Sequence, residues 1–252
     1  MAAQRACVFC GHPNVTNEHA FPLWLRKVVT DRPAQHTTVF LDRHGELREH
    51  RQHAAAPFSI TVSRVCQDEC NGGWMSRLEQ DARPFLEPML SGRGRVLHTE
   101  GQKLVATWAY KTALMLNFAL PASSRAATAE ECHFLYRHRE PPPSARVFMF
   151  AYGPGAEASA SYRGHPLYIG ESQIAAIDTG VPPNGYIMTF SVARLGFQVV
   201  NTTEPDQAFP LSRLSGEVIH RIHPREYASA TWAPKPALSH DQFLALADRF
   251  AR

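Results

Sequence analysis

The chain has 252 residues, of which 44% are hydrophobic, 10% aromatic and 19% charged, and its formal net charge is +3. This apolar content fills one substantial core or two small ones, which excludes a chain that is disordered throughout. The charge balance is too small to identify a nucleic-acid partner by itself. Because no stretch is apolar enough to cross a bilayer and no secretory signal is evident, we expect a cytoplasmic protein without a membrane partner.

Four of the five cysteines form two close pairs: Cys7 with Cys10, and Cys66 with Cys70. In a reducing compartment such pairs are typical of thiolate ligands for a soft metal, and four thiolates suit tetrahedral Zn²⁺. Gly11, directly after the first pair, favours the tight turn that such a pair needs. The alternative is a disulfide framework, which is typical of small secreted domains. We therefore predict a structural zinc ion on these four cysteines.

The sequence up to residue 95 predicts a turn-rich module. Residues 37–41 and 58–65 are rich in β-branched and aromatic side chains, which predicts two strands of one long hairpin that turns at residues 43–46. The apolar residues after the second Cys pair recur at helical spacing, and Asn71 is placed to cap that helix at its N-terminus. A Gly-Arg-Gly sequence at 92–94 then indicates a boundary.

The remaining residues predict an α+β region. Residues 99–120 are apolar on nearly every face, which is typical of a central buried helix, and residues 127–137 predict a second helix. Ser239 or Asp241 is placed to cap a last amphipathic helix at 239–250. Strands are expected at 146–152, 165–169, 174–177, 186–192, 195–200 and 218–222. We predict two domains, 1–95 and 96–252, and a mostly antiparallel sheet in the second.

The motifs of the first part have a definite order. C-x2-C is followed by Glu18-His19, a hairpin-like stretch, and C-x3-C, and then directly by Asn71 and a helix. This order resembles the HNH endonuclease superfamily, and within it the members with a treble-clef zinc knuckle and a ββα-metal active site. The resemblance covers residues 7–90. The segments C-N-G-G-W-M-S-R-L-E and A-T-W-A-Y-K-T-A further resemble actinobacterial proteins identified as HNH endonucleases.

The resemblance implies an activity and a set of roles. The activity is hydrolysis of phosphodiester bonds in nucleic acid, with DNA favoured over RNA. His19 would be the general base, which suits an imidazole that titrates near neutral pH. Glu18 would bind a catalytic divalent cation, Mg²⁺ or Mn²⁺, because hard cations prefer oxygen ligands. Asn71 would hold the loop that carries the base.

The sequence departs from the family at its third conserved position. The family has His or Asn on the helix, whereas this chain has Glu79, about two helical turns beyond Asn71. Glu79 either offers a carboxylate to the catalytic cation, together with Glu18, or marks a site that has lost its metal. The alternatives are structural: Glu18 opens a helix, His19 packs against an aromatic ring, and Glu79 pairs with Arg83 at i,i+4.

Three functions remain open. The first is a divalent-metal-dependent HNH-type endonuclease, in which the second domain supplies substrate selection or dimerisation as a homo-oligomer. The second is a zinc-stabilised module that binds nucleic acid without cleaving it, which the neutral charge balance around the second Cys pair favours. The third is a non-nuclease enzyme on the same scaffold. We expect Lys111, inside its apolar helix, to snorkel or to pair rather than to act in catalysis.

Overall fold

A computed structural model of the chain describes most of its residues. The described residues are 6–13, 15–29, 35–41, 47–54, 58–120, 125–153, 160–169, 174–175, 183–202, 218–233 and 236–248. Within these ranges, the backbone alone is described for residues 35–41, 47–54, 64, 66, 67, 168, 169, 174 and 175.

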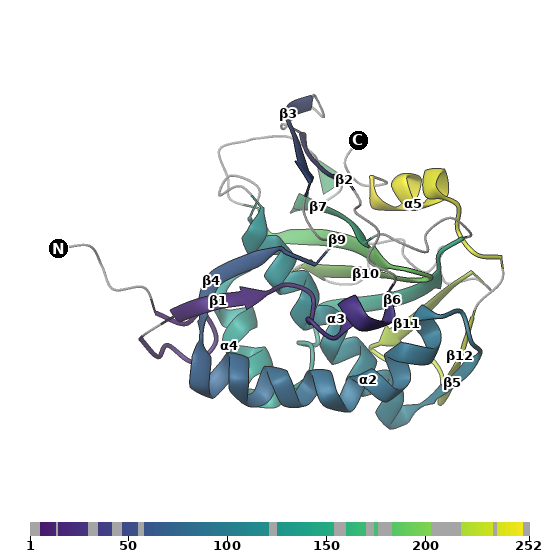
Figure 1. Cartoon of the computed structure of the whole chain (residues 1–252), viewed down its shortest axis with the longest axis horizontal. Helices are drawn as coiled ribbons and strands as arrows, with labels where there is room; N and C mark the ends of the chain where they lie inside the picture. The colour runs from purple at the N-terminus through teal and green to yellow at the C-terminus, as the bar shows by residue number, and fades with distance from the viewer. Residues whose placement is uncertain are drawn as a thin grey trace.

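Helix α3 (Thr99–Ala119) is the centre of the molecule. It lies between a six-stranded sheet on one side and helix α2 (Ser76–Leu90) on the other, and it contacts both (Figure 1). Fifteen of its residues are buried, from Gly101 and Gln102 through Val105–Asn117, so packing on all sides explains why its sequence has no polar face. The predicted central buried helix is confirmed.

The six-stranded sheet is antiparallel and has the order β11-β6-β10-β9-β7-β8. Its strands are β6 (Ala145–Ala151), β7 (Ala160–Ile169), β8 (Ile174–Ala175), β9 (Gly185–Val192), β10 (Leu195–Thr202) and β11 (Ile219–His223). Every residue of β9 is buried, which explains the continuous apolar runs at the middle of the sheet. The predicted α+β class with antiparallel sheets is confirmed.

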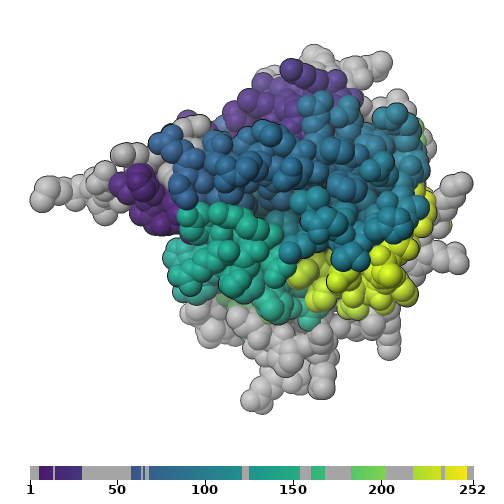
Figure 2. Space-filling model, turned by 90° about the horizontal axis from the view of Figure 1, so that it is seen from below, coloured from purple at the N-terminus to yellow at the C-terminus, as the bar shows by residue number. Residues whose placement is uncertain are grey.

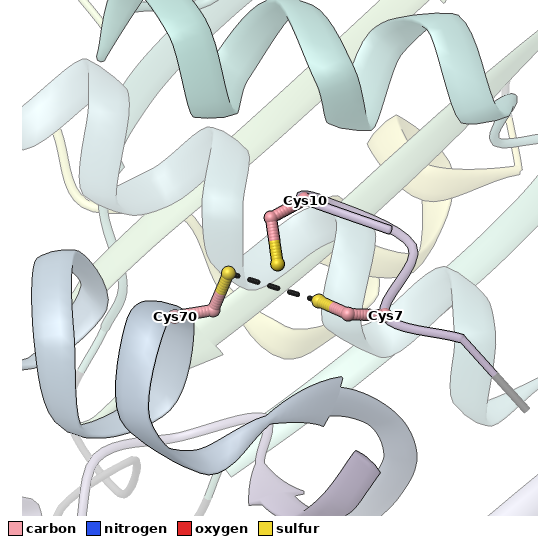
Figure 3. Close-up of side chains that lie close together, drawn as sticks. All are labelled: Cys7, Cys10 and Cys70. Carbon is pink, nitrogen blue, oxygen red and sulfur yellow. Dashed lines mark hydrogen bonds between the residues drawn. The ribbon is translucent and has the colours of Figure 1, made fainter. Parts of the chain in front are cut away.

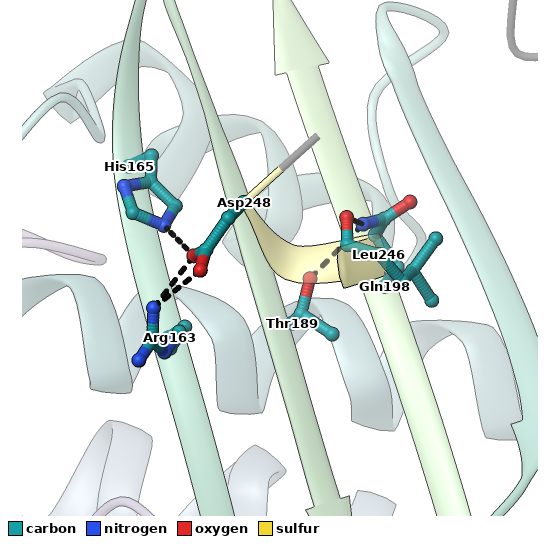
Figure 4. Close-up of polar contacts among 6 residues, drawn as sticks. All are labelled: Arg163, His165, Thr189, Gln198, Leu246 and Asp248. Carbon is teal, nitrogen blue, oxygen red and sulfur yellow. Dashed lines mark hydrogen bonds and ion pairs between the residues drawn. The ribbon is translucent and has the colours of Figure 1, made fainter. Parts of the chain in front are cut away.

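Helix α5 (His240–Ala247) covers the sheet face opposite α3 (Figure 1). Ser239 caps it with a complete capping box, as its sequence predicts. The amide of Gln198 donates a hydrogen bond to the carbonyl of Leu246, at 3.1 Å. Just beyond the helix, Asp248 reaches two side chains of β7 (Figure 4). These polar contacts fix the end of α5 on the sheet.

The N-terminal part is built on a second, two-stranded sheet. Strand β1 (Val15–His19) pairs antiparallel with β4 (Thr61–Cys66), and the short helix α1 (Leu25–Val28) follows β1. After β4 come the wide helical turns of η1 (Gln67–Met75) and then α2. The chain order is therefore cysteine turn, two paired strands and helix.

Two expectations for this part are wrong. Strand β2 (Gln35–Leu41) pairs with β3 (Leu47–Ala54), and residues 58–65 do not form the second strand of that hairpin. A short connection favours pairing with the next strand in the chain, while the apolar side chains of β4 are buried against the core. Asn71 does not cap a helix, because helical turns already begin at Gln67 and the N-cap of α2 is Met75. The predicted turn at 43–46 lies outside the described residues.

The remaining elements close the lower face of the molecule. Strand β5 (Arg95–His98) pairs antiparallel with β12 (Ser229–Trp232), and α4 (Ala129–His138) lies beside α2 (Figure 2). The buried side chains of the N-terminal part, of α3 and of one sheet face form one continuous core. The division into domains at residue 95 therefore stays a prediction. None of the described helices is long and apolar enough to cross a membrane.

Candidate functional site

The first cysteine pair lies on a tight turn. The backbone N–H of Gly11 donates to the carbonyl of Cys7 at 2.9 Å, and the N–H of Cys7 donates to the carbonyl of His12 at 2.9 Å. Gly11 has a φ of +76°, which a residue with a side chain adopts only with strain. The turn explains how Cys7 and Cys10 direct two sulfur atoms to one point.

Cys70, on η1, brings a third sulfur to that point. We call Cys7, Cys10 and Cys70 the sulfur cluster: their sulfur atoms all lie within 4.8 Å of one another and point toward a shared centre (Figure 3). The Sγ atoms of Cys7 and Cys70 are 3.7 Å apart. A tetrahedral zinc site with Zn–S bonds of about 2.3 Å requires sulfur atoms about 3.8 Å apart. The Cys7–Cys70 separation matches this geometry, and the cluster could hold a metal ion.

The backbone of η1 is shaped for this approach. Its dihedral angles leave the helical region at Gly73, and a Cβ atom there would lie 2.8 Å from the carbonyl oxygen of Asp68. A side chain at this position would therefore force the turn that carries Cys70 to shift. The rings of Phe9, between Cys7 and Cys10 in the chain, and of Trp74, four residues after Cys70, meet edge to face with centroids 5.6 Å apart. This contact packs the two segments that carry the cysteines against each other.

The Cys70 thiol resists ionisation when the sulfur cluster holds no cation. The hydrogen bond between Cys7 and Cys70 raises the pKa of Cys70 far above its ordinary value, and burial raises it further. A bound cation reverses this balance, because it stabilises the thiolates that the neighbouring sulfurs destabilise. The cluster therefore has the chemistry of a site that ionises together with metal uptake.

Neither of the other two cysteines is among the three described sulfur atoms that lie together. The Cys66 side chain lies outside the described part of the structure, but its backbone ends β4 opposite Val15, four residues before Cys70. Cys132 is buried in α4. The four cysteines with described side chains are all free of disulfides, so the structure gives no support to a disulfide framework among them.

A second cluster lies where β1, α2 and α3 meet. The Lys111 ammonium on α3 is 3.1 Å from Glu18 Oε1 on β1 and 2.9 Å from Glu79 Oε1 on α2. We call these three residues the carboxylate cluster. The Lys111 side chain is completely buried, and those of Glu18 and Glu79 are 7% and 18% exposed. The two carboxylates that the sequence assigns to one cation are thus held by one ammonium.

Lys111 keeps its charge despite its burial. Burial alone would lower the pKa of Lys111, but the charges of Glu79 and Glu18 and their hydrogen bonds hold it above its ordinary value. The expectation that Lys111 pairs is therefore confirmed. Two structural alternatives are wrong, because Glu18 lies in a strand and Arg83 pairs with Glu87 at 3.0 Å, not with Glu79.

The predicted base and the predicted loop residue lie close by in the chain. His19 ends β1 directly after Glu18, opposite Thr61 of β4. Successive strand residues point to opposite faces, and accordingly Glu18 is buried while His19 is partly exposed. Asn71 follows Cys70 in η1, so it sits next to the sulfur cluster. Contact of His19 or Asn71 with a substrate or cation stays a prediction.

The carboxylate cluster fits a divalent cation in its donors but not in its charge. Two carboxylate oxygens from separate elements are the ligand type that Mg²⁺ and Mn²⁺ prefer. The Lys111 ammonium, however, already holds both of them. The sequence does not predict that Lys111 lies between Glu18 and Glu79. A charged residue inside an apolar helix does indicate that its side chain has a partner.

Comparison with known proteins adds no relative: no protein-family model, no curated protein and no solved structure matches the chain. The functional argument therefore depends on the sequence motifs and on the geometry of the two clusters.

Proposed function

We propose that this chain is an HNH-type endonuclease that hydrolyses phosphodiester bonds in nucleic acid. The observation that carries the proposal is the convergence of Glu18 and Glu79, from β1 and α2, on the buried Lys111 ammonium, with Glu18 directly before His19 in the chain. Glu18 and His19 are the positions to which the HNH resemblance assigns a metal ligand and the general base, and Glu79 stands where the family has His or Asn. Two carboxylates so far apart in the sequence would not meet there by local structure alone.

A structural zinc ion on the sulfur cluster is part of the proposal. Soft thiols and a 3.7 Å sulfur separation suit Zn²⁺. Cys66 is the proposed fourth ligand. The order of cysteine turn, β1–β4 pair and α2 supports a treble clef, because that fold places a knuckle, a hairpin and a helix around one zinc ion. The zinc would hold β1 and α2 in the relative position that the carboxylate cluster needs.

The chain's own residues supply the hydrolytic chemistry as follows. His19, on the exposed side of β1, takes a proton from water so that the oxygen attacks phosphorus. Glu18 and Glu79 would hold the cation, which when bound stabilises negative charge on the phosphate and on the leaving oxygen. Asn71 would fix the loop near His19 through its amide, which both donates and accepts hydrogen bonds.

A second candidate is a zinc-stabilised module that binds nucleic acid without cleaving it. Lys111 specifically favours this candidate, because its ammonium takes the place that the catalytic cation would need. A module of this kind would bind nucleic acid with a strong dependence on salt concentration and would release it unchanged.

The test is cleavage of plasmid DNA and of RNA by zinc-loaded protein with added Mg²⁺ or Mn²⁺. His19→Ala should lower the cleavage rate by a factor of about 10²–10⁴, the usual contribution of a general base. His133→Ala, which removes an exposed imidazole of α4, is the matched control and should cleave at the wild-type rate.

Equal rates in wild type and His19→Ala would exclude His19 as the base. Salt-sensitive binding by folded, zinc-loaded protein that cleaves neither substrate at any divalent-ion concentration would instead support the second candidate.

A further inference from the structure

We propose that Lys111 is a built-in competitor for the divalent cation: its ammonium and the cation occupy Glu18 and Glu79 in turn. The proposal builds on the proposed nuclease site, but it is tested by cation binding and not by cleavage. It assigns to Lys111 a role in setting the cation concentration at which the site loads.

The Lys111 ammonium and a divalent cation are too close together to occupy the carboxylate cluster at the same time. Mg²⁺ or Mn²⁺ binds carboxylate oxygens at about 2.0–2.2 Å and would sit between the two carboxylates. The ammonium already lies 2.9 Å from one of these oxygens and 3.1 Å from the other. A divalent cation in the same space would meet a positive charge at close range with little water to screen it. Loading therefore requires the ammonium to leave.

Burial makes that departure costly. The Lys111 side chain is completely buried near the middle of α3, and its neighbours Tyr110 and Thr112 are buried as well. An ammonium that leaves both carboxylates must find water or another acceptor, and reaching either requires α3 or α2 to shift. The wild-type site should accordingly bind divalent cations weakly, although its two carboxylates are well placed for them.

The net charge of the carboxylate cluster is balanced by a divalent cation but not by the Lys111 ammonium. Two carboxylates and one ammonium sum to one negative charge, whereas two carboxylates and one divalent cation sum to zero. Replacing the ammonium by a neutral side chain of similar length therefore leaves two negative charges that a divalent cation can neutralise. Lys111→Met makes this change and keeps the apolar stem of the side chain.

The experiment titrates Mn²⁺ into zinc-loaded protein and follows free Mn²⁺ by electron paramagnetic resonance. Lys111→Met should bind one Mn²⁺ at least about tenfold more tightly than wild type, because the competing charge is gone. Its melting temperature should rise with Mn²⁺ concentration. Lys103→Met is the matched control: Lys103 lies on the same helix but pairs with Glu140 at the surface, so its Mn²⁺ affinity should equal that of wild type.

Three results would overturn the proposal. The first is a tight Mn²⁺ site in wild type that Glu79→Gln removes, since Lys111 would then be no obstacle. The second is equal Mn²⁺ affinity in wild type and Lys111→Met. The third concerns folding: if Lys111→Met stays unfolded in Mn²⁺ while Lys111→Met with Glu79→Gln folds, the cation does not replace the ammonium. If no variant cleaves nucleic acid, the proposed nuclease activity is wrong. The Mn²⁺-binding measurements still test the role of Lys111 in that case.

Discussion

The sulfur cluster and the carboxylate cluster differ in the source of their positive charge. Both join the N-terminal segment to the η1–α2 segment, and both gather groups that bind cations. In the sulfur cluster the Cys70 thiol stays neutral without a cation, because its contact with Cys7 and its burial raise its pKa. The carboxylate cluster instead has a lysine that the fold itself supplies, and Glu79 and Glu18 raise the pKa of that lysine against the effect of burial.

This difference teaches how each cluster depends on its surroundings. The sulfur cluster needs an external ion to become fully charged, so its stability should follow metal supply. The carboxylate cluster is complete without one, so its stability should follow the integrity of the ion pair. One chain thus uses two ways to bring buried anionic ligands together.

The largest effect should come from breaking the sulfur cluster. Cys70→Ser removes a thiolate ligand, and we expect loss of bound metal and global unfolding at room temperature. A structural zinc site contributes on the order of 10 kcal/mol, which is about the whole stability of an ordinary domain. Metal content by plasma mass spectrometry and far-ultraviolet circular dichroism measure the two losses.

Cys132→Ala is the control for that substitution. It removes a buried thiol that does not belong to the sulfur cluster, so metal content should not change. A stable, folded Cys70→Ser protein would show that the cluster does not depend on an external cation and would remove the contrast between the two clusters.

Parts of this architecture are predictable because they rest on local patterns. The apolar sequence of α3, the strands of the large sheet and the Ser239 cap of α5 each carry their signal within one element. The close spacing of Cys7 and Cys10, with Gly11 directly after them, likewise indicates a metal-binding turn from three nearby residues alone.

Other parts depend on contacts that no local pattern contains. Strand β1 is short and polar, and it becomes a strand through pairing with β4, more than 40 residues later in the chain. For the same reason, local patterns predict the wrong partner for residues 58–65. Lys111 meets Glu18 and Glu79 across 93 and 32 residues, so the sequence could require a partner for Lys111 but could not identify one.

A buried carboxylate with neutral partners should change the free energy of unfolding with pH by an intermediate amount. Glu131 on α4 accepts a hydrogen bond from the Tyr110 hydroxyl at 3.3 Å, and that hydroxyl accepts one from the Asn201 amide at 3.4 Å. Burial raises the pKa of Glu131 from its ordinary 4.5 to about 7. Whereas Glu18 and Glu79 share the Lys111 ammonium, Glu131 has neutral partners, and its surroundings favour the protonated acid.

The sign of the resulting pH dependence follows from proton binding. Between pH 4.5 and about 7 the folded state holds the Glu131 proton and the unfolded state has lost it. Stability therefore falls as pH rises through this range, by about 2–3 kcal/mol from this group. Glu131→Gln should remove most of that fall, measured by urea unfolding at pH 5 and pH 8. An unchanged fall in the variant would mean that Glu131 does not carry it.

The smallest effect should come from an ion pair that water still reaches. Arg163 and Asp248, at 2.6 Å, have side chains 25% and 27% exposed, and His165 contacts the same carboxylate at 3.0 Å. Burial would raise the pKa of Asp248, but hydrogen bonds from His165 and Arg163 and the charge of Arg163 outweigh it and lower the pKa. This stabilisation is present at neutral pH and is lost as pH falls through the lowered pKa.

Asp248→Asn should therefore cost about 1 kcal/mol or less at pH 7, because solvent screens the pair and the amide keeps part of the hydrogen bonding. Lys111→Met should cost about 3–5 kcal/mol without divalent ions, because it leaves buried charges uncompensated. Chemical unfolding at pH 7, repeated at high salt concentration, compares them: salt should shrink the Asp248 effect and leave the Lys111 effect nearly unchanged. Equal costs would mean that burial does not strengthen the ion pairs of the carboxylate cluster. Lys111 would then be no barrier to binding of a divalent cation.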